Sequence, residues 1–374
     1  MVSPTTRDVV ARVPPAFVAA CRHRLGAGHV SHEMLQSQVE IVSPVFTEHA
    51  GARSEMTRLR SGIGAVASEM SLAVVAAGSH PLGAWKSQAP TAKARYERLV
   101  DDFQIVGRRN LLCGMHVHVG VSAGIDRVDL MNRLMPWLPC FLALSTSSPF
   151  WNRDRTGLLS YRQAAYDEWP HSGIPDFFED ESDYAAFADL LADCGAIDGP
   201  GSIWWAIRPS HSFPTLELRI ADCCTDLDDA LALAALFRCL VRAHVRQPRL
   251  GRKRSNATRR VIDENRWRAK RYGIDAKFID ETRGIALPFR EVLGELLKTL
   301  EEDIQVFGCA REIEHLDALL MRGTSAQRQL EVYRQGIDAG RTRLESLRAV
   351  VDWLIHSSAP DIAPAAHPST MPPT

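Results

Sequence analysis

Residues 113–121 read CGMHVHVGV and place two histidines two positions apart in an apolar run between glycines. On a β-strand, residues i and i+2 point to the same face. His116 and His118 are therefore expected to share one face, with the intervening hydrophobic side chains on the other. Two imidazoles on one face could bind a metal ion, and zinc is one alternative because imidazole is a common zinc ligand.

Two further stretches alternate in the same way, LQSQVEIV at residues 35–42 and TLELRIAD at residues 215–222. The polar side chains that would share one face of each strand are Gln36, Gln38 and Glu40 in the first, and Thr215, Glu217 and Arg219 in the second. A wetted face of an antiparallel sheet is the simple alternative for any one strand. If the three strands share a sheet, however, their polar faces converge in one patch.

Such a patch would combine carboxylates, an imidazole and a guanidinium. Carboxylates suit a hard divalent cation such as Mg²⁺ or Mn²⁺, and a guanidinium suits phosphate or carboxylate. A zinc site fits less well, because Arg219 beside the ligands would repel the ion. The chain has no Walker loop and no GxGxxG motif, so no glycine-rich phosphate loop is predicted.

Other arginines stand in contexts that favour a role in this chemistry. Arg208 follows the apolar run IWWAI, where a charge is costly unless it is paired. Arg162 lies in SYRQAAY. The segment NRWRAKRYG carries Arg266, Arg268 and Arg271 at helical spacings that wrap round the helix, so a solvated basic face is the alternative there.

The composition is that of a soluble globular protein. Of 374 residues, 45% are hydrophobic and 24% charged, and the net charge is −1. This balance gives no argument for nucleic acid or an anionic membrane as a partner, and no apolar run approaches the roughly 18 residues of a membrane span. Eight cysteines without a CxxC pair favour reduced thiols in a cytoplasmic protein over disulfides or a zinc site.

Hydrophobic periodicity predicts one α+β domain over residues 1–357, with a helical C-terminal part. Helices are expected at residues 15–24, 47–70, 91–110, 126–145, 182–194 and 226–247, and over almost all of the remainder to 357. The 126–145 helix should be kinked at Pro136 and Pro139. Strands are expected at 35–44, 72–81 and 113–121, and two more within 202–222. Residues 148–178 are interpreted as a functional loop or lid, and 358–374 as a disordered, proline-rich tail.

Four separated motifs in this order, LLCGMHVHVGV, ALSTSSPFW, IRPSHSFPTLELRIAD and NRWRAKRYGID, resemble the carboxylate–amine ligase branch of the glutamate–cysteine ligase type 2 family. The resemblance covers roughly residues 7–357. It implies a fold like the catalytic domain of glutamine synthetase, a curved antiparallel sheet backed by helices. It also implies ATP- and Mg²⁺-dependent amide formation, in which the γ-carboxylate of glutamate becomes an acyl phosphate and the amine of cysteine displaces phosphate.

The resemblance also implies roles for individual residues. By motif, Glu40, His116 and Glu217 resemble metal ligands, and Glu217 and Arg219 resemble catalytic residues. Arg219, Arg208 and Arg268 resemble residues that contact the nucleotide. Arg162 and His118 resemble residues that contact the substrates. Asp222 is a weaker candidate for orienting the Glu217 strand. The expected partners are therefore small molecules, with no nucleic acid and no membrane.

Two features depart from the family pattern. Members usually begin with a strand similar to GIEEE, whereas this sequence begins MVSPTTRDVV, and SPFWNRDRTG stands where SPFWxGRDTG is usual, with Arg153 replacing glycine. A missing acidic strand would weaken the binding of ATP and metal and leave a sheet edge that favours association into a homo-oligomer. The alternatives are a non-catalytic or impaired nucleotide- or metabolite-binding member, and a metal-dependent hydrolase that uses the HxH pair.

Overall fold

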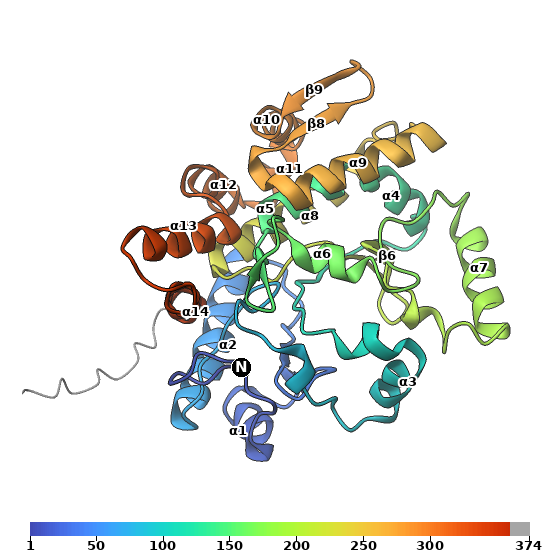
Figure 1. Cartoon of the computed structure of the whole chain (residues 1–374). Coiled ribbons are helices and arrows are strands. Elements are labelled where there is room, and N and C mark those ends of the chain that lie inside the picture. The colour runs from blue at the N-terminus through green and yellow to red at the C-terminus, as the bar shows by residue number, and fades with distance from the viewer. Residues whose placement is uncertain (360–374) are drawn as a thin grey trace, which may run out of the picture.

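The computed structural model describes residues 1–359 and shows a small antiparallel sheet surrounded by helices (Figure 1). The sheet has the strand order β3 (Val117–Gly120), β7 (Thr215–Leu218) and β6 (Ile207–Pro209). In its register, His118 lies opposite Glu217, and Glu217 lies opposite Arg208. Three polar residues from separate parts of the sequence therefore stand in one row across the sheet.

The opposite face of β7 packs on the core. Leu216, Leu218 and Ile220 are fully buried and belong to the largest hydrophobic cluster, together with residues of α4 (Arg127–Leu134), α5 (Leu138–Ser145) and α8 (Leu227–Arg246). Burial of alternate residues holds the strand in register, because a slip of one residue would exchange the two faces. The hydrophobic face thereby presents the polar face of β7 away from the core.

The remaining elements surround this centre (Figure 1). The helices are α1 (Pro15–Leu25), α2 (His49–Glu69), α3 (Ala94–Arg108), α6 (Tyr161–Tyr166), α7 (Glu181–Asp193), α9 (Asn256–Tyr272), α10 (Phe289–Thr299), α11 (Glu301–Phe307), α12 (Ala310–Arg322), α13 (Ser325–Asp338) and α14 (Arg343–Ser358). Two-stranded pairs are β1 (Val30–His32) with β2 (Val39–Ile41), β4 (Phe150–Trp151) with β5 (Asp154–Arg155), and β8 (Lys277–Asp280) with β9 (Ile285–Pro288). In the part of the chain described, no helix is long and apolar enough to cross a membrane.

Most predicted helices are confirmed, with shifted ends. The expected kink lies between α4 and α5, where the short 3-10 turn Met135–Trp137 contains Pro136. The prediction of an almost entirely helical C-terminal part is wrong after α9, because β8 and β9 form a hairpin there. Gly284, with φ +67°, forms its turn.

Two predicted strands are placed differently. The 35–44 stretch does not join the central sheet, since its strand β2 pairs with β1, where Glu40 lies opposite Ser31. The 72–81 stretch is not a strand and forms only isolated bridges at Ala73 and Ser79. Its backbone instead forms hydrogen bonds with side chains. The hydroxyls of Ser358 and Ser147 accept hydrogen bonds from the N–H groups of Ala76 and Gly78.

The predicted lid, residues 148–178, is largely anchored. It contains β4, β5 and α6, and Ser148, Ser160 and Arg162 within it are almost completely buried. The first half of this segment is therefore part of the scaffold rather than an open loop. The predicted tail falls mainly on residues 360–374, which lie outside the described residues, and Ser358 is the buried last residue of α14.

Candidate active site

Glu217 is the centre of the polar row. Its side chain is 3% exposed, yet it faces two guanidinium groups. Arg208 Nε donates to Oε2 at 2.8 Å, and Arg219 Nη1 donates to Oε1. Burial alone would raise the pKa of Glu217, but the charges of Arg219 and Arg208 outweigh it and lower the pKa to about 2. The carboxylate is therefore ionised at any physiological pH.

Arg208, whose charge is costly in an apolar strand unless it is paired or used, is paired in the structure. Besides Glu217, its Nη1 donates to the carbonyl oxygens of Gly201, at 3.2 Å, and of Ile203. These bonds satisfy a charge that would be costly in an otherwise apolar strand. Arg208 is thus held against Glu217 from the edge strand of the sheet.

The two histidines lie on the same face, as the alternation predicts, since residues 115, 117 and 119 turn toward the core. His116 Nδ1 and His118 Nε2 are each 3.8 Å from Glu217 Oε1. Burial and the charge of Arg219 hold the pKa of His116 well below its usual range, and burial also lowers that of His118. Both rings are therefore neutral near pH 7, and His118 Nδ1 pairs with Thr215 Oγ1 at 2.9 Å.

Arg219 keeps part of its hydrogen-bonding capacity unused. Its Nη1 contacts Glu217 and lies 3.4 Å from His116 Nδ1. Its Nε is buried and has no hydrogen-bond partner, although buried N–H groups are normally paired. Burial lowers the pKa of Arg219, but the nearby Tyr166 and Glu217 raise it overall. A cation fixed on this face is suited to an anionic ligand such as a phosphoryl group.

Arg162 is placed differently from a residue that contacts substrate. Its side chain is 4% exposed, and it donates to the backbone oxygens of Arg219, Ile220 and Ala221 at 3.0–3.3 Å. An added Cβ on Gly114 would lie 2.2 Å from Arg162 Nη2, so this glycine makes room for the guanidinium. The geometry supports a positioning role for Arg162 at the end of β7.

Asp222 completes this arrangement and is fully buried. It accepts hydrogen bonds from the backbone N–H of Ser147 at 3.0 Å and from the hydroxyls of Ser148 and Ser160 at 2.7 and 2.9 Å. Burial raises its pKa, against the charge of Arg162 at 3.8 Å. This network ties the strand end to the 148–162 segment, and the orienting role of Asp222 stays a prediction.

The predicted metal ligands do not form a cation site in this arrangement. Glu40 is exposed on β2, where it accepts a hydrogen bond from the Ser31 hydroxyl at 3.0 Å, and arginines occupy both oxygens of Glu217. Through residue 359, only Asp226, Asp229 and His315 bring three ligand atoms within 4.8 Å of one another, and Arg322 already pairs with both aspartates. The residues present therefore do not fit a protein-held Mg²⁺.

Sequence reasoning missed Glu33, which follows β1. Its Oε2 accepts a hydrogen bond from the Met34 N–H at 2.6 Å. Burial raises its pKa, Glu40 raises it further, and Arg95 and Arg219 lower it. Glu33 thus lies in the electrostatic field of Arg219. It stands outside the alternating stretch, in the sequence SHEML, so periodicity carries no signal for it.

Arg268 is not brought to Glu217. It pairs with Glu264 at 2.9 Å and donates to the Lys277 carbonyl at 3.1 Å. The inward face of α9 instead carries Arg266 and Lys270, which are almost fully buried and bind Asp167 at 2.8 and 2.6 Å. The arginines of this segment do wrap round the helix. The alternative of a solvated basic face therefore does not apply to Arg266, which is buried.

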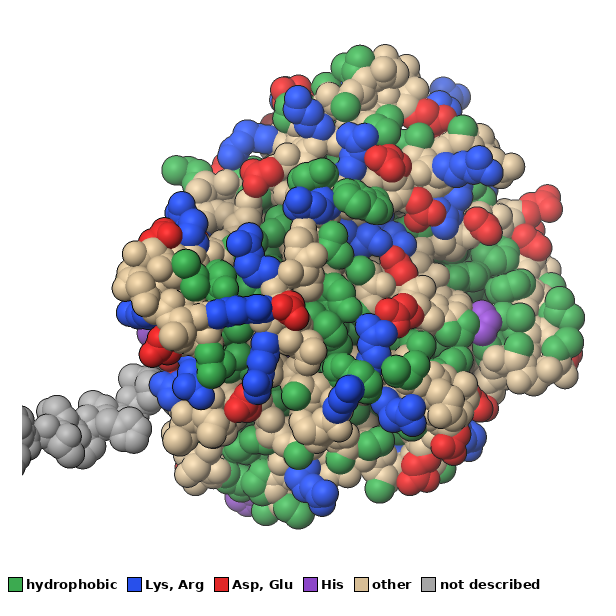
Figure 2. Space-filling model, viewed as in Figure 1, with side chains coloured by type: hydrophobic (Ala, Val, Ile, Leu, Met, Phe, Trp, Pro, Cys, Tyr) green, Lys and Arg blue, Asp and Glu red, His purple; other side chains and the backbone are tan. Residues whose placement is uncertain are grey.

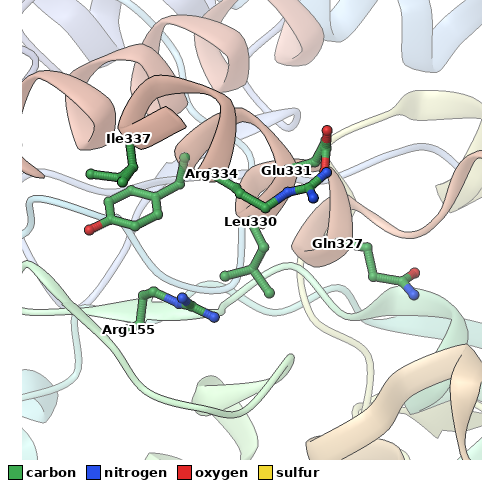
Figure 3. Close-up of a pocket in the computed structure, with 7 residues that line it drawn as sticks. Arg155, Gln327, Leu330, Glu331, Arg334 and Ile337 are labelled. Carbon is green, nitrogen blue, oxygen red and sulfur yellow. The ribbon is translucent and has the colours of Figure 1, made fainter. Parts of the chain in front are cut away.

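Two hollows lie outside the polar row. One, of about 300 Å³, lies between β5 and α13, and in the close-up Leu330 and Arg155 approach each other across it (Figure 3). The other, of about 440 Å³, lies at the β6–β7 turn. On the face shown in Figure 2, basic and acidic side chains are intermixed without a large single-sign patch.

The sequence matches the family model described as glutamate–cysteine ligase family 2 over residues 1–351. A protein of Ectopseudomonas mendocina, named "Putative glutamate--cysteine ligase 2", is 45% identical over 352 residues, which cover 94% of this chain and 92% of that protein.

Two solved structures share the fold. A bifunctional glutathione synthetase from Pasteurella multocida aligns over 94% of this chain and 51% of its own, with a TM-score of 0.67 and 15% identity. A glutamate–cysteine ligase from Francisella tularensis, solved in complex with AMP, aligns over 94% of this chain and 89% of its own, with a TM-score of 0.64 and 12% identity. The predicted ligase-type fold of sheet and helices is thereby confirmed.

Proposed function

The chain belongs to glutamate–cysteine ligase family 2, and from this premise we propose that it is an ATP-dependent carboxylate–amine ligase with weak glutamate–cysteine ligase-like activity. The observation that carries the proposal is the Glu217 centre, where two guanidinium groups flank one buried carboxylate and Arg219 Nε has no partner. Family membership supplies the reaction class, a ligase that forms an amide bond.

The chemistry of the reaction explains why such a centre is useful. A carboxylate is a poor electrophile, so we propose that ATP converts the γ-carboxylate of glutamate to an acyl phosphate, which the amine then attacks. Arg219 and Arg208 would stabilise the negative charge that moves with the phosphoryl group. The related enzyme solved with AMP supports the use of a nucleotide. Mg²⁺ or Mn²⁺ enters this proposal only as the ion that accompanies the nucleotide.

The remaining residues have supporting parts in the proposal. Arg162 and Asp222 would hold the end of β7, so that Glu217 and Arg219 keep their orientation. His118 would face the substrates as a neutral ring, and Glu33 would add a carboxylate beside Arg219. A cytoplasmic location belongs to the same proposal, because ATP and glutamate are cytoplasmic metabolites.

One observation favours a second candidate function, an impaired member that binds nucleotide without turnover. Among the described residues, Glu40, His116 and Glu217 do not bring three ligand atoms within 4.8 Å of one another, and arginines occupy both oxygens of Glu217. Such a protein would bind ATP with similar contacts but would lack a protein-held cation.

ADP release separates the two candidates. The purified chain is incubated with ATP, Mg²⁺ and glutamate, with and without each of a panel of amines, and ATP binding is measured beside it by calorimetry. The ligase predicts ADP formation that requires both glutamate and an amine. Binding of ATP without ADP formation would instead favour the impaired member, and absence of both would contradict the nucleotide-dependent reading altogether.

A further inference from the structure

The polar face of the sheet continues past Glu217 to the β6–β7 turn. Thr215 precedes Glu217 by two residues on β7 and so shares its face. Phe213 lies in the β6–β7 turn, two residues before Thr215. The ring of Phe213 lies 6.1 Å from the ring of His118, edge to face at 86°. The polar side chains of Arg219, Glu217 and Thr215 are therefore followed, at the turn, by an aromatic side chain that is 61% exposed.

Gly120 leaves this end of the face open. It lies opposite Thr215 in the register and two residues after His118, so an added side chain would point to the polar face. No atom lies within 4 Å of the position of its added Cβ. The backbone pairing nevertheless continues, because the Val121 N–H donates to the Pro214 carbonyl at 2.9 Å. The open space is thus due to the missing side chain of Gly120, and the sheet itself is continuous there.

A hollow of about 440 Å³ lies at this open end, between residues 121–125 and the turn 210–214. This volume is within the range of small-molecule sites. Arg127 anchors the turn, since its Nη1 donates to the carbonyl oxygens of Ser210 and Phe213 at 3.0 and 3.2 Å. The position of Phe213 is therefore held by the scaffold.

The lining of the hollow indicates which part of a substrate it suits. Its one guanidinium, that of Arg127, already pairs with Glu181 at 3.0 Å as well as with the two carbonyls. The lining thus has no unpaired arginine or lysine for a phosphate or carboxylate. His211 also lines the hollow. Glu181 is paired with Arg127, so the exposed ring of Phe213 is the feature that favours an apolar or cationic group.

We propose that this hollow receives the distal end of the amine substrate and that Phe213 selects amines that carry no carboxylate there. The inference rests on the proposed ligase function. It divides the polar face into two ends, with the anionic groups at Arg219 and Arg208 and the amine at Phe213. The preferred acceptor class is then amines with a neutral or cationic tail, rather than amino acids.

Cysteamine and cysteine test this preference, because they differ only by the carboxylate. ADP release is measured with ATP, Mg²⁺, glutamate and either amine. The wild-type protein should have the lower KM for cysteamine. Phe213→Ala should raise that KM by about 3- to 10-fold, as expected for the loss of one aromatic contact, and should leave kcat within about twofold.

Gly120→Val provides the converse change, because it adds a side chain next to Val121, which lines the hollow, without a clash at Cβ. It should raise the KM for cysteamine at least as much as Phe213→Ala. The matched control is Gly51→Ala on α2, which also has no atom within 4 Å of the added Cβ and lies outside the proposed site. A wild-type preference for cysteine, or unchanged KM values in both variants, would overturn the proposal and leave the ligase function standing.

If the wild-type protein releases no amine-dependent ADP, the ligase function fails, and binding then tests the hollow by itself. Saturation-transfer NMR of cysteamine should give a signal with the wild-type protein that Gly120→Val removes. Absence of that signal in the wild type, or its persistence in Gly120→Val, would overturn the proposal.

Discussion

Two arginine–carboxylate pairs lie on and just beyond β7, Arg219 with Glu217 and Arg162 of α6 with Asp222, and they differ in what their donors contact. Arg162 donates to three backbone carbonyls around Asp222, and its side chain is 4% exposed. Arg219 contacts Glu217, is 12% exposed, and retains an Nε without a partner. Arg162 binds backbone carbonyls and so holds the strand end, whereas Arg219 directs Nη1 at the Glu217 carboxylate on the polar face, where it can meet a ligand. Residue type alone does not distinguish these two roles.

The comparison predicts its largest effect for Arg219→Lys. Lysine keeps the positive charge beside Glu217 but loses the planar group and its unused N–H. We expect the turnover number to fall by about 100- to 1000-fold, as when a donor to a developing charge is removed. The free energy of unfolding, measured by urea titration, should change by no more than about 1 kcal/mol. A large loss of stability with little loss of turnover would place Arg219 with Arg162 instead.

The pH dependence of stability should have opposite signs for the two carboxylates. The pKa of Glu217 is lowered to about 2 from 4.5, so its contribution is present above pH 4.5 and is lost as the pH falls toward 2, by up to about 3 kcal/mol. The pKa of Asp222 is raised by burial, so stability falls as the pH rises through its titration. Urea unfolding between pH 4.5 and 3 should show a flatter profile in Glu217→Gln and a steeper one in Asp222→Asn. Equal slopes in both variants would contradict the difference between the sites.

A smaller effect is expected for Gly114→Ala. Its added Cβ would lie 2.2 Å from Arg162 Nη2 and displace the guanidinium from its carbonyls. We expect a loss of about 2 kcal/mol in the free energy of unfolding, typical of overpacking in a buried site. The matched control is Gly120→Ala, which has open space at Cβ and should stay within about 0.5 kcal/mol of the wild type. Similar free energies of unfolding in both variants would contradict the scaffold role of Arg162.

The smallest effect is expected for Arg268→Ala. This arginine pairs with Glu264 one helical turn away, an arrangement that contributes roughly 0.3–0.5 kcal/mol. The dissociation constant for ATP, measured by calorimetry, should change by less than about twofold, because Arg268 bonds to Glu264 and the Lys277 carbonyl rather than to the Glu217 centre. A tenfold weakening would restore Arg268 to the nucleotide site that the sequence resemblance implies.

The polar row could be predicted from sequence because alternation reports directly on which face a side chain takes. His116, His118 and Glu217 are placed as that pattern predicts. What alternation does not report is which strands pair, and Glu40 was therefore assigned to a sheet that its strand does not join. The strand predicted at 72–81 failed for a related reason, since side-chain hydroxyls far away in sequence bind its backbone.

The role of Arg162 could not be predicted from the sequence for a similar reason. Its carbonyl acceptors lie 57 to 59 residues away, and no local pattern marks them. Glu33 was missed because it lies outside the strands whose periodicity could be scored. The family resemblance indicated the reaction class, which geometry alone leaves open. The structure distinguished residues that bind the backbone, such as Arg162, from those that face the polar site, such as Arg219.

Isotope transfer tests the central claim most directly. Glutamate labelled with ¹⁸O in its γ-carboxylate is incubated with ATP, Mg²⁺ and an amine substrate, and the inorganic phosphate released is analysed by mass spectrometry. The proposed acyl phosphate predicts one labelled oxygen in each phosphate formed with product, and a loss of labelled phosphate in parallel with turnover in Arg219→Lys. Amide product accompanied by unlabelled phosphate would contradict the account.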